Sequence, residues 1–328
     1  MIWMSWRQFR AQALVGVIAV AALAVYLVIL GMQIRHGYSD NLDLCQKQGG
    51  GCASVMTEFQ NVYKSRLYFL DAILVLIPAL IGLFWGAPLV TRELEAGTHR
   101  LVWNQSITRR RWLAIKLLVV GLASMALAGA ASLLLTWAAS PFDLVAENRF
   151  TTLLFGARNI VPIAYAAFAF VLGTVVGIMV RRAVPAMALT FLVFVVIQVL
   201  VPNMVRPHLM TPVTTSQPMT AQVIKNLSFL GRHPTISGLK IPGAWVTSSS
   251  ELLTSSGQPI DQNKYGECTS GAFDAAADCL GKLNLHVDIT YQPIDRYWTF
   301  QWLESALFIG LSVLLVAFGM WRIKGRLT

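Results

Sequence analysis

The sequence predicts an all-α polytopic membrane protein with six transmembrane helices. The 328 residues are 55% hydrophobic and 13% charged, with a mean hydropathy of +0.59, which is too apolar for a soluble globular protein of this size. Six apolar runs reach the length of about 20 residues that a membrane helix needs. About half of the basic residues lie in short segments between the apolar runs and at the chain ends. If the N terminus is cytoplasmic, all of these segments lie on the cytoplasmic side of the membrane. The net charge of +10 therefore indicates topology rather than nucleic-acid binding.

Each of the six apolar runs is interpreted as one span. The first is not a cleavable signal, because its apolar stretch is long and the residues that follow it offer no small-residue cleavage site. An even number of spans places both termini on the same side of the membrane. The expected spans are Ala13–Met32, Tyr68–Val90, Leu113–Ala138, Ile160–Val180, Ala183–Val201 and Trp302–Met320.

The distribution of charge orients these spans. If the N terminus is cytoplasmic, the only acidic residues on the inner side are Glu93 and Glu95. About half of the 26 lysines and arginines then lie inside, as the preference of basic residues for short cytoplasmic loops requires. We therefore expect both termini in the cytoplasm. The inner basic residues are Arg7, Arg10, Arg92, Arg100, Arg109, Arg110, Arg111, Lys116, Arg181, Arg182, Arg322, Lys324 and Arg326.

The four cysteines support the same orientation. Cys45 and Cys52 fall in the first outer loop, and Cys268 and Cys279 fall in the last one. In an oxidising compartment these spacings are read most simply as two local disulfides, with four unpaired thiols as the alternative. No metal site is expected, because neither a Cys-x-x-Cys motif nor paired histidines accompany them.

The N-terminal ten residues form an amphipathic pattern. Trp3, Trp6 and Phe9 recur every three residues, while Arg7 and Arg10 occupy another arc of the same helix. This pattern is typical of a helix that lies in the membrane interface. An equally good interpretation is the cytoplasmic start of the first span, with tryptophan at the level of the lipid headgroups.

The connections between spans differ in length. Residues 33–67 are polar and are expected to form only a short disulfide-closed outer loop, and residues 140–159 are expected to carry one short surface helix. Arg181 and Arg182 alone join spans four and five, so these helices should form a tight hairpin, with Pro185 in the first helical turn. The two arginines serve first as a cytoplasmic anchor, and contact with a cytoplasmic partner is the alternative.

Residues 202–299 are the only segment long enough for a separate soluble domain. The segment is rich in Pro, Ser, Thr and Gly, which predicts a small irregular extracytoplasmic cap with a short helix at Ala272–Leu283 and a strand-like run at Leu285–Tyr291. The expected organisation is therefore 1–201 with the interfacial helix and spans one to five, 202–299 as the cap, and 300–328 with span six and a cytoplasmic tail.

No catalytic or nucleotide-binding motif is visible, so an enzyme is not expected. The spans are also expected to lack the buried acids and lysines of proton-coupled transporters, with Asp71 and Glu304 near the outer ends of spans two and six. Gln198 is the one strong hydrogen-bonding side chain in a span core, and it fits a helix-joining role better than substrate binding. The five histidines, His36, His99, His208, His233 and His286, are scattered in loops.

The inner loop at 92–116 is the most informative segment. It begins with the acidic pair Glu93 and Glu95, Gly97 allows a helix stop, and a short apolar face precedes the basic cluster at 109–111. An amphipathic connector with separated charges suits docking in the groove of a soluble partner.

This loop resembles that of the ABC-2 type permease family, which has the pattern Glu-x-x-x-Gly-Thr, an apolar stretch, Pro-x-x-Arg and a lysine at the start of span three. Glu93, Gly97, Thr98, Arg109 and Lys116 match it, whereas Ser106 stands in place of the proline. The six-span layout agrees, and Trp6-Arg7-Gln8 with the enlarged last loop looks like an actinobacterial subgroup. By this resemblance, the ATPase-coupling residues are Glu93, Glu95, Gly97, Thr98, Arg100, Leu101, Arg109 and Lys116.

The resemblance implies a permease subunit in a bacterial inner membrane, paired as a homodimer or with a related permease and bound to two cytoplasmic ATPase subunits. ATP and Mg²⁺ would be held by those ATPases, and this chain would need no cofactor of its own. Closure of the ATPases would push on the loop as a coupling helix and tilt spans two and five. The N-terminal amphipathic helix would also touch the ATPase.

The leading functional prediction is ATP-driven export of a hydrophobic or amphipathic compound, such as an antibiotic, a peptide or a lipid. The alternative is a subunit that transmits or senses a signal without moving a substrate, which the enlarged segment 202–299 permits. A secondary transporter or membrane enzyme is disfavoured by the absence of buried charges and catalytic motifs. Substrate-binding residues are not assigned, because the lining of such a pathway is as apolar as a lipid-facing helix.

Overall fold

The computed structural model divides the chain into two compact units. The membrane unit comprises Met1–Ala146, Thr151–Arg206 and Trp298–Thr328, and the α/β unit comprises Glu147–Phe150 and Pro207–Tyr297. The residues that the structure describes are 2–48, 52–97, 108–145, 149–227, 233–234, 239, 241 and 243–325.

The membrane unit is built from six long apolar helices, which confirms the predicted fold class. Span two is a composite, since α2 continues through the π-helical turn η1 into α3. Span five likewise continues from α8 into the short turns η2 and η3. The spans and their continuations are α1 (Ile2–Gln48), α2 (Cys52–Ile81), η1 (Gly82–Gly86), α3 (Pro88–Glu95), α5 (Arg109–Val145), α7 (Val161–Val180), α8 (Ala183–Leu200), η2 (Val201–Val205), η3 (Arg206–His208) and α12 (Tyr297–Gly325).

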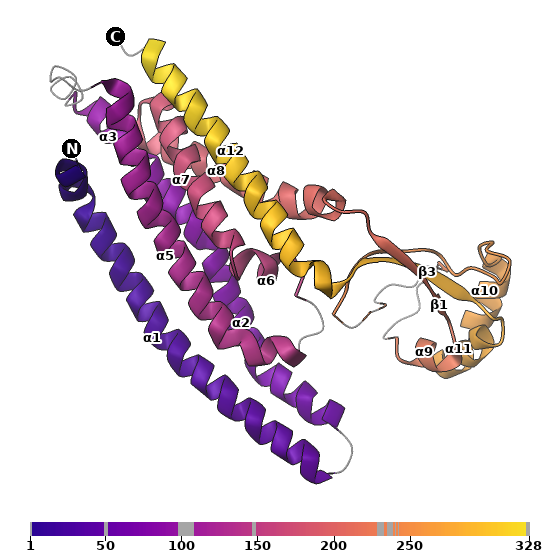
Figure 1. Ribbon diagram of the computed structural model, residues 1–328. Helices are drawn as coiled ribbons and strands as arrows, with labels where there is room; N and C mark the ends of the chain where they lie inside the picture. The colour runs from indigo at the N-terminus through magenta and orange to yellow at the C-terminus, as the bar shows by residue number, and fades with distance from the viewer. Residues whose placement is uncertain are drawn as a thin grey trace. The chain divides into compact units, whose positions relative to one another are not determined.

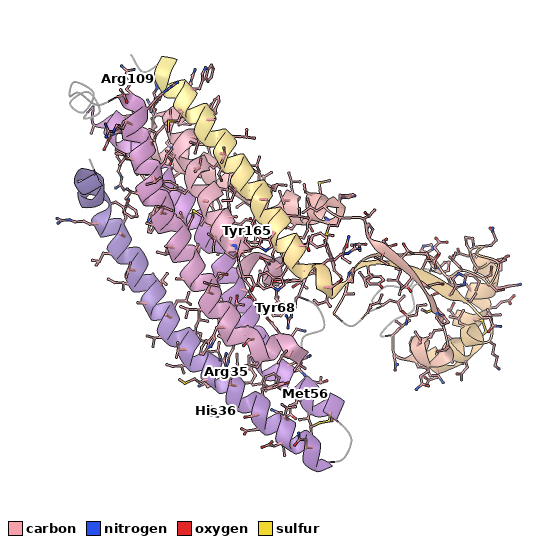
Figure 2. All side chains as sticks on the ribbon, in the orientation of Figure 1. Arg35, His36, Met56, Tyr68, Arg109 and Tyr165 are labelled. Carbon is pink, nitrogen blue, oxygen red and sulfur yellow. A yellow bond between two sulfur atoms is a disulfide. The ribbon has the colours of Figure 1, made fainter. Side chains whose placement is uncertain are left out.

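Helix α1 begins and α12 ends at the same end of this bundle (Figure 1). Arg109 lies at that end as well, while Arg35, His36 and Met56 lie at the opposite end (Figure 2). The cytoplasmic location of the two termini stays a prediction.

Helix α7 forms the centre of the bundle and is buried along most of its length, whereas α1 is mostly exposed. Its glycines allow direct backbone contact with span two. A Cβ atom at Gly173 would lie 2.3 Å from the carbonyl oxygen of Gly82, and one at Gly177 would lie 2.7 Å from that of Ala87. Two Gly-x-x-x-Gly pairs, Gly82 with Gly86 and Gly173 with Gly177, therefore bring the helices together as in other membrane helix pairs.

The first connection is a helical hairpin, so the prediction of a polar loop at 33–67 is wrong. Helix α1 continues to Gln48 and α2 starts at Cys52. Aromatic packing supports these extensions, because Phe59 is buried and lies 5.8 Å from Tyr38 and 5.2 Å from Tyr63 between ring centroids. Tertiary packing thus keeps helical a stretch that hydropathy alone assigns to a loop.

The connection between spans three and four also differs from its prediction. Helix α5 runs through Pro141 to Val145, and the short helix α6 (Thr152–Ala157) is not a surface helix. Four of its residues are buried: Leu154, Phe155, Gly156 and Ala157. By contrast, Arg181 and Arg182 join α7 to α8 as expected, with Arg181 in the left-handed conformation (φ 59°) and Pro185 in the first turn of α8.

The N-terminal pattern lies within α1, which runs without a break from Ile2. Trp3, Trp6, Arg7 and Arg10 are therefore parts of the first span's own helix, and Arg10 is exposed. Their role as a membrane-surface element stays a prediction.

The α/β unit contains a three-stranded antiparallel sheet in the order β1-β3-β2. The predicted strand-like run becomes β3, the central strand, whose Val287 and Ile289 are fully buried. Strands β1 and β2 form in the Pro-rich part of residues 202–299, where an irregular structure was expected, so this unit is more regular than predicted. Its elements are β1 (Val213–Pro218), α9 (Ala221–Lys225), β2 (Trp245–Ser249), α10 (Gln262–Thr269), α11 (Phe273–Gly281), β3 (His286–Gln292) and η4 (Ile294–Arg296).

Both disulfides join the cysteines that lie close together in the sequence. Cys45 pairs with Cys52 across the α1–α2 hairpin, with 5.0 Å between their Cα atoms. Cys268 pairs with Cys279 across α10 and α11, with a Cα separation of 5.4 Å. Each bridge thus fixes a helix–helix connection within one unit.

Candidate functional site

The residues that match the loop pattern fall at the two ends of a segment that joins α3 to α5. The structure describes Glu93, Glu95 and Gly97 on one side of this segment and Arg109 and Lys116 on the other. The remaining predicted coupling residues, Thr98, Arg100 and Leu101, lie outside the described residues. The geometry of the site is therefore described by the end of α3 and the start of α5, the two ends of this segment.

An ion pair joins these ends across 23 residues of sequence. Lys116 Nζ donates to Glu93 Oε1 at 2.5 Å, and the two side chains are only 5% and 11% exposed. The Lys116 ammonium also lies 4.7 Å from the centroid of the Trp112 ring, a cation–π distance. Breaking such a buried pair leaves an uncompensated charge, so the end of span two is held firmly to the start of span three.

Glu95 connects the same site to span five. Its Oε1 atom accepts a hydrogen bond of 2.9 Å from the backbone N–H of Ala183, the first residue of α8. A carboxylate at a helix N terminus satisfies an otherwise unpaired N–H and is favoured by the helix dipole. Glu93 therefore contacts span three, and Glu95 contacts span five.

Gly97 ends α3 in the left-handed conformation. Its φ is +68°, and its N–H donates to the carbonyl oxygen of Leu94 at 3.3 Å. A side chain in this conformation would be strained even though a Cβ atom would meet nothing within 4 Å. The glycine of the loop pattern thus sets the direction in which the chain leaves span two.

A buried apolar cluster supports the anchored ends. It unites α3, α5, α7 and α12, because it consists of Val90, Trp112, Leu113, Ile178 and Ile323. Displacement of either end of the segment would therefore be transmitted to several spans at once.

The membrane unit also contains buried charges, so the expectation that its spans lack them is wrong. Asp71 and Glu304 are fully buried, and each is paired with an arginine. The partners, Arg158 and Arg206, lie beside the spans in short connecting elements. Pairing with arginine explains how carboxylates can be buried in apolar helices without transferring protons.

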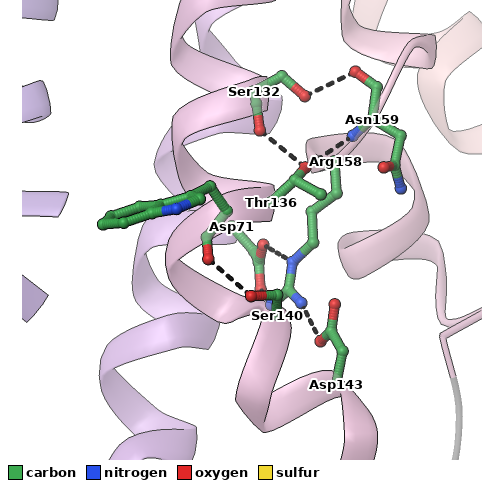
Figure 3. A network of polar contacts seen from close by, with 8 residues as sticks. Asp71, Ser132, Thr136, Ser140, Asp143, Arg158 and Asn159 are labelled. Carbon is green, nitrogen blue, oxygen red and sulfur yellow. Dashed lines mark hydrogen bonds and ion pairs between the residues drawn. The ribbon is translucent and has the colours of Figure 1, made fainter. Parts of the chain in front are cut away.

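Arg158 lies between two aspartates (Figure 3). It donates to Asp71 through two bonds, from Nε at 2.8 Å and from Nη2 at 2.7 Å, and its Nη1 atom donates to Asp143. Burial alone would lower the pKa of Arg158, but the hydrogen bond to Asp71 and the charges of both aspartates raise that pKa above its ordinary value. The arginine thus remains charged and joins α2, α5 and the connection before α7.

Hydroxyl groups of α5 hold the neighbouring backbone (Figure 3). Ser132 Oγ donates to the carbonyl oxygen of Asn159 at 2.9 Å, and the Asn159 N–H donates to Thr136 Oγ1 at 3.0 Å. Asn159 has a φ of 62°, a conformation that asparagine tolerates better than most residues. These bonds fix the turn that carries Arg158 to its aspartates.

A second buried network joins spans four, five and six. Arg206 donates to both oxygens of Glu304, at 2.6 Å from Nε and 3.0 Å from Nη2, and the Tyr165 hydroxyl donates to the same carboxylate. The Arg206 guanidinium also lies 4.0 Å from the centroid of the Phe155 ring. Charge, hydrogen bonding and cation–π contact thus converge where α7, the end of span five and α12 meet.

These two networks were not predicted from the sequence, although it contains signals of them. A single acid in an apolar span, such as Asp71 or Glu304, predicts a buried partner, and an arginine flanking a span is its natural candidate. Gln198 was expected to join helices by hydrogen bonding. Its carbonyl oxygen does not do so, since Oε1 is buried without a hydrogen-bond partner among the described residues. The arrangement as a whole connects helices. Within the described ranges, no cluster of His, Cys, Asp or Glu could hold a metal ion.

Comparison with known proteins identifies the family. No curated protein and no solved structure shows significant similarity to this chain. The family described as "ABC-2 membrane transporter related" matches residues 17–206, more than half of the chain, and its match ends at Arg206, the last residue of the membrane unit's middle segment. The likeness to an actinobacterial subgroup stays a prediction. Together with the six apolar helices, the match makes this chain a multi-pass protein of a bacterial plasma membrane, a non-catalytic permease that belongs to the ABC-2 transporter family and works with an ABC ATPase.

Proposed function

We propose that this chain is the permease subunit of an ATP-driven exporter that moves a hydrophobic or amphipathic compound outward. Two copies of the chain would assemble with two cytoplasmic ATPase subunits, which bind ATP and Mg²⁺. The segment between α3 and α5 would act as the coupling helix. Thr98, Arg100 and Leu101 belong to this segment and are among the proposed coupling residues.

The contacts at the two ends of this segment carry the proposal. Glu93 pairs with Lys116 of span three, and Glu95 accepts a hydrogen bond from the first residue of span five. A push on the segment would therefore reach span three through a buried ion pair and span five through a short, exposed hydrogen bond. The buried Glu93–Lys116 pair transmits displacement better than an exposed ion pair, which is weak and screened.

The test is purification of the full chain in mild detergent from its native membrane, followed by measurement of ATP turnover. We expect a Walker-motif ATPase to accompany the chain in equal amounts. Gly97→Ala should reduce turnover about fivefold, because the left-handed conformation costs a residue with a Cβ atom about 1 kcal/mol or more. Gly257→Ala is the matched control, since Gly257 has a φ of +76°, open space around it and a place in the α/β unit.

The ion pair gives a second arm of the same experiment. Glu93→Lys and Lys116→Glu should each uncouple turnover, whereas the double exchange should restore most of it because it rebuilds the pair. Absence of any ATPase partner, or equal turnover in all of these variants, would contradict the proposal.

Signal transmission is the second candidate function, and the α/β unit favours it. This unit has its own buried core, which includes Leu252, Leu280 and Val287, and its own disulfide. A transmission role predicts that a ligand added on the side of the α/β unit changes ATP turnover without ATP-dependent accumulation of any compound in inverted vesicles. Accumulation driven by ATP would instead establish export.

A further inference from the structure

A cavity of about 250 Å³ lies between α1, α3 and α5. Its apolar wall includes Phe9, Leu89 and Val120, and its polar wall includes Arg92, Glu93 and Lys116. Phe9 is itself fixed in place, because its ring contacts that of Trp85 edge-on with 4.7 Å between centroids. The cavity thus combines a firm apolar side with a charged side.

The charged side has an excess of one positive charge. Glu93 is paired with Lys116, so these two charges largely offset each other. Arg92 is exposed, and no described residue forms an ion pair with it. The cavity is therefore complementary to a group with a single negative charge, and a guanidinium binds a phosphate through two parallel hydrogen bonds.

The position of the cavity along the helices indicates its surroundings. All three helices belong to apolar spans, and Phe9 begins the first of these spans. Arg92 lies three residues before the end of α3, about 5 Å along the axis, and Lys116 lies seven residues after the start of α5, about 10 Å along it. With the ends of α3 and α5 at the cytoplasmic surface, as the predicted orientation places them, this depth corresponds to the boundary between lipid headgroups and acyl chains.

We propose that the cavity binds an anionic phospholipid, with the phosphodiester on Arg92 and the first methylenes of an acyl chain against Phe9, Leu89 and Val120. Basic pockets between membrane helices recognise such headgroups. A lipid enters from the bilayer at this depth, whereas a soluble partner would approach from beyond the helix ends. The lipid would be bound next to the Glu93–Lys116 pair, which makes it a candidate regulator of that contact. The binding site itself does not depend on the proposed transport function.

Phosphatidylglycerol serves as the probe. The full chain is purified in mild detergent after reconstitution in an equal mixture of phosphatidylglycerol and phosphatidylcholine, and the retained lipids are counted by native mass spectrometry. We expect wild type to retain phosphatidylglycerol preferentially. Arg92→Gln should lower this retention about fivefold, the factor that corresponds to about 1 kcal/mol for one basic residue near the membrane surface.

Two further variants show whether a loss of retention in Arg92→Gln comes from the cavity itself, from misfolding or from the loss of any positive charge. Arg92→Lys keeps the charge but loses the two parallel hydrogen bonds, so it should retain more phosphatidylglycerol than Arg92→Gln and less than wild type. Arg111→Gln removes an exposed arginine at the same end of the bundle, outside the cavity wall, and should leave retention unchanged. Equal retention by wild type and Arg92→Gln, or an equal loss in Arg111→Gln, would overturn the proposal.

Two competitors test the identity of the ligand. Soluble glycerophosphate should not displace the lipid, because it lacks the acyl chains that the apolar wall contacts. Displacement at equal concentration would assign the cavity to a small phosphate-bearing solute instead. The purified ATPase should also leave the lipid in place. If the ATPase displaced phosphatidylglycerol, the cavity would be assigned to protein docking and the lipid site would be refuted.

Discussion

Arg158 and Arg206 have the same arrangement in two parts of the membrane unit. Each donates two hydrogen bonds to one buried carboxylate and makes a further contact, with Asp143 in one case and the Phe155 ring in the other. Removing two charges from water costs several kcal/mol per ion, so such pairs add little net stability. We expect their larger effect to be on specificity, because an alternative helix arrangement would leave a charge buried without a partner.

Loss of one partner should therefore be far more damaging than loss of both. Arg158→Met should lower the free energy of unfolding by about 3 to 5 kcal/mol, because it leaves Asp71 buried and uncompensated. The double variant Asp71→Asn with Arg158→Gln should recover part of this loss. Thermal unfolding in detergent measures both values.

Lys225→Met is the control for this comparison. Lys225 also pairs with an aspartate, Asp278, but both side chains are exposed, so solvent screens the interaction and little change is expected. If Arg158→Met unfolded at the same temperature as Lys225→Met, the buried network would have no structural role.

The sequence singled out Glu93 and Lys116 but not the Asp71–Arg158 pair, and the coupling role of Glu93 and Lys116 stays a prediction. Glu93 and Lys116 were identified because they occupy fixed positions in a loop pattern, and the structure brings them together. Asp71 and Arg158 are 87 residues apart, and no local pattern links them. Hydropathy averaged over a span also hides a single charged residue, so only the reasoning that a buried acid needs a partner could have revealed the pair.

At the scale of elements, the contact between α7 and η1 depends on the absence of side chains. A Cβ atom at Gly173 would lie 2.3 Å from the Gly82 carbonyl oxygen and 2.7 Å from the Ala87 nitrogen, and backbone atoms cannot rotate away. Gly173→Ala should therefore force the two spans apart and destabilise the protein by about 1 to 3 kcal/mol. The unfolding temperature in detergent is the measurement.

Gly310 in α12 provides the matched control for this substitution. A Cβ atom there meets nothing within 4 Å, so Gly310→Ala should be neutral or should stabilise the helix by up to about 1 kcal/mol. Equal stability of the two variants would show that the backbone contact is not tight.

The six spans were predictable because each needs about 20 apolar residues, whatever surrounds it. The residues at which these helices begin and end were not predictable in the same way. Polar residues beyond Met32 remain helical because Tyr38, Phe59 and Tyr63 pack between α1 and α2. The α/β unit shows the same limit, since β1 and β2 form by pairing with β3 across long sequence separations and have weak local signals of their own.

At the scale of the whole molecule, the family match lies almost entirely within the membrane unit. The match covers residues 17–206 and ends with the middle segment of the membrane unit. The greater part of the α/β unit, Pro207–Tyr297, and the last membrane segment, Trp298–Thr328, lie beyond it. The part that the family shares contains the Glu93–Lys116 pair, the Arg158 network and the glycine contact of α7. We therefore expect features particular to this chain, such as ligand selection, to reside in the α/β unit, and the coupling of ATP turnover to reside in the shared helices.

The proposed direction of transport depends on the orientation of the whole chain, which accessibility can test. The α1–α2 hairpin with its disulfide lies at the opposite end of the bundle from Arg109 (Figure 2). With cytoplasmic termini, a membrane-impermeant phosphine should reduce the Cys45–Cys52 bridge in intact cells, and an impermeant maleimide should then label it. The exposed Arg110, when changed to cysteine, should react only after the cells are permeabilised. The reverse result would place the segment between α3 and α5 outside the cell, where no ATPase could bind it, and would exclude the coupling role of Glu93 and Glu95.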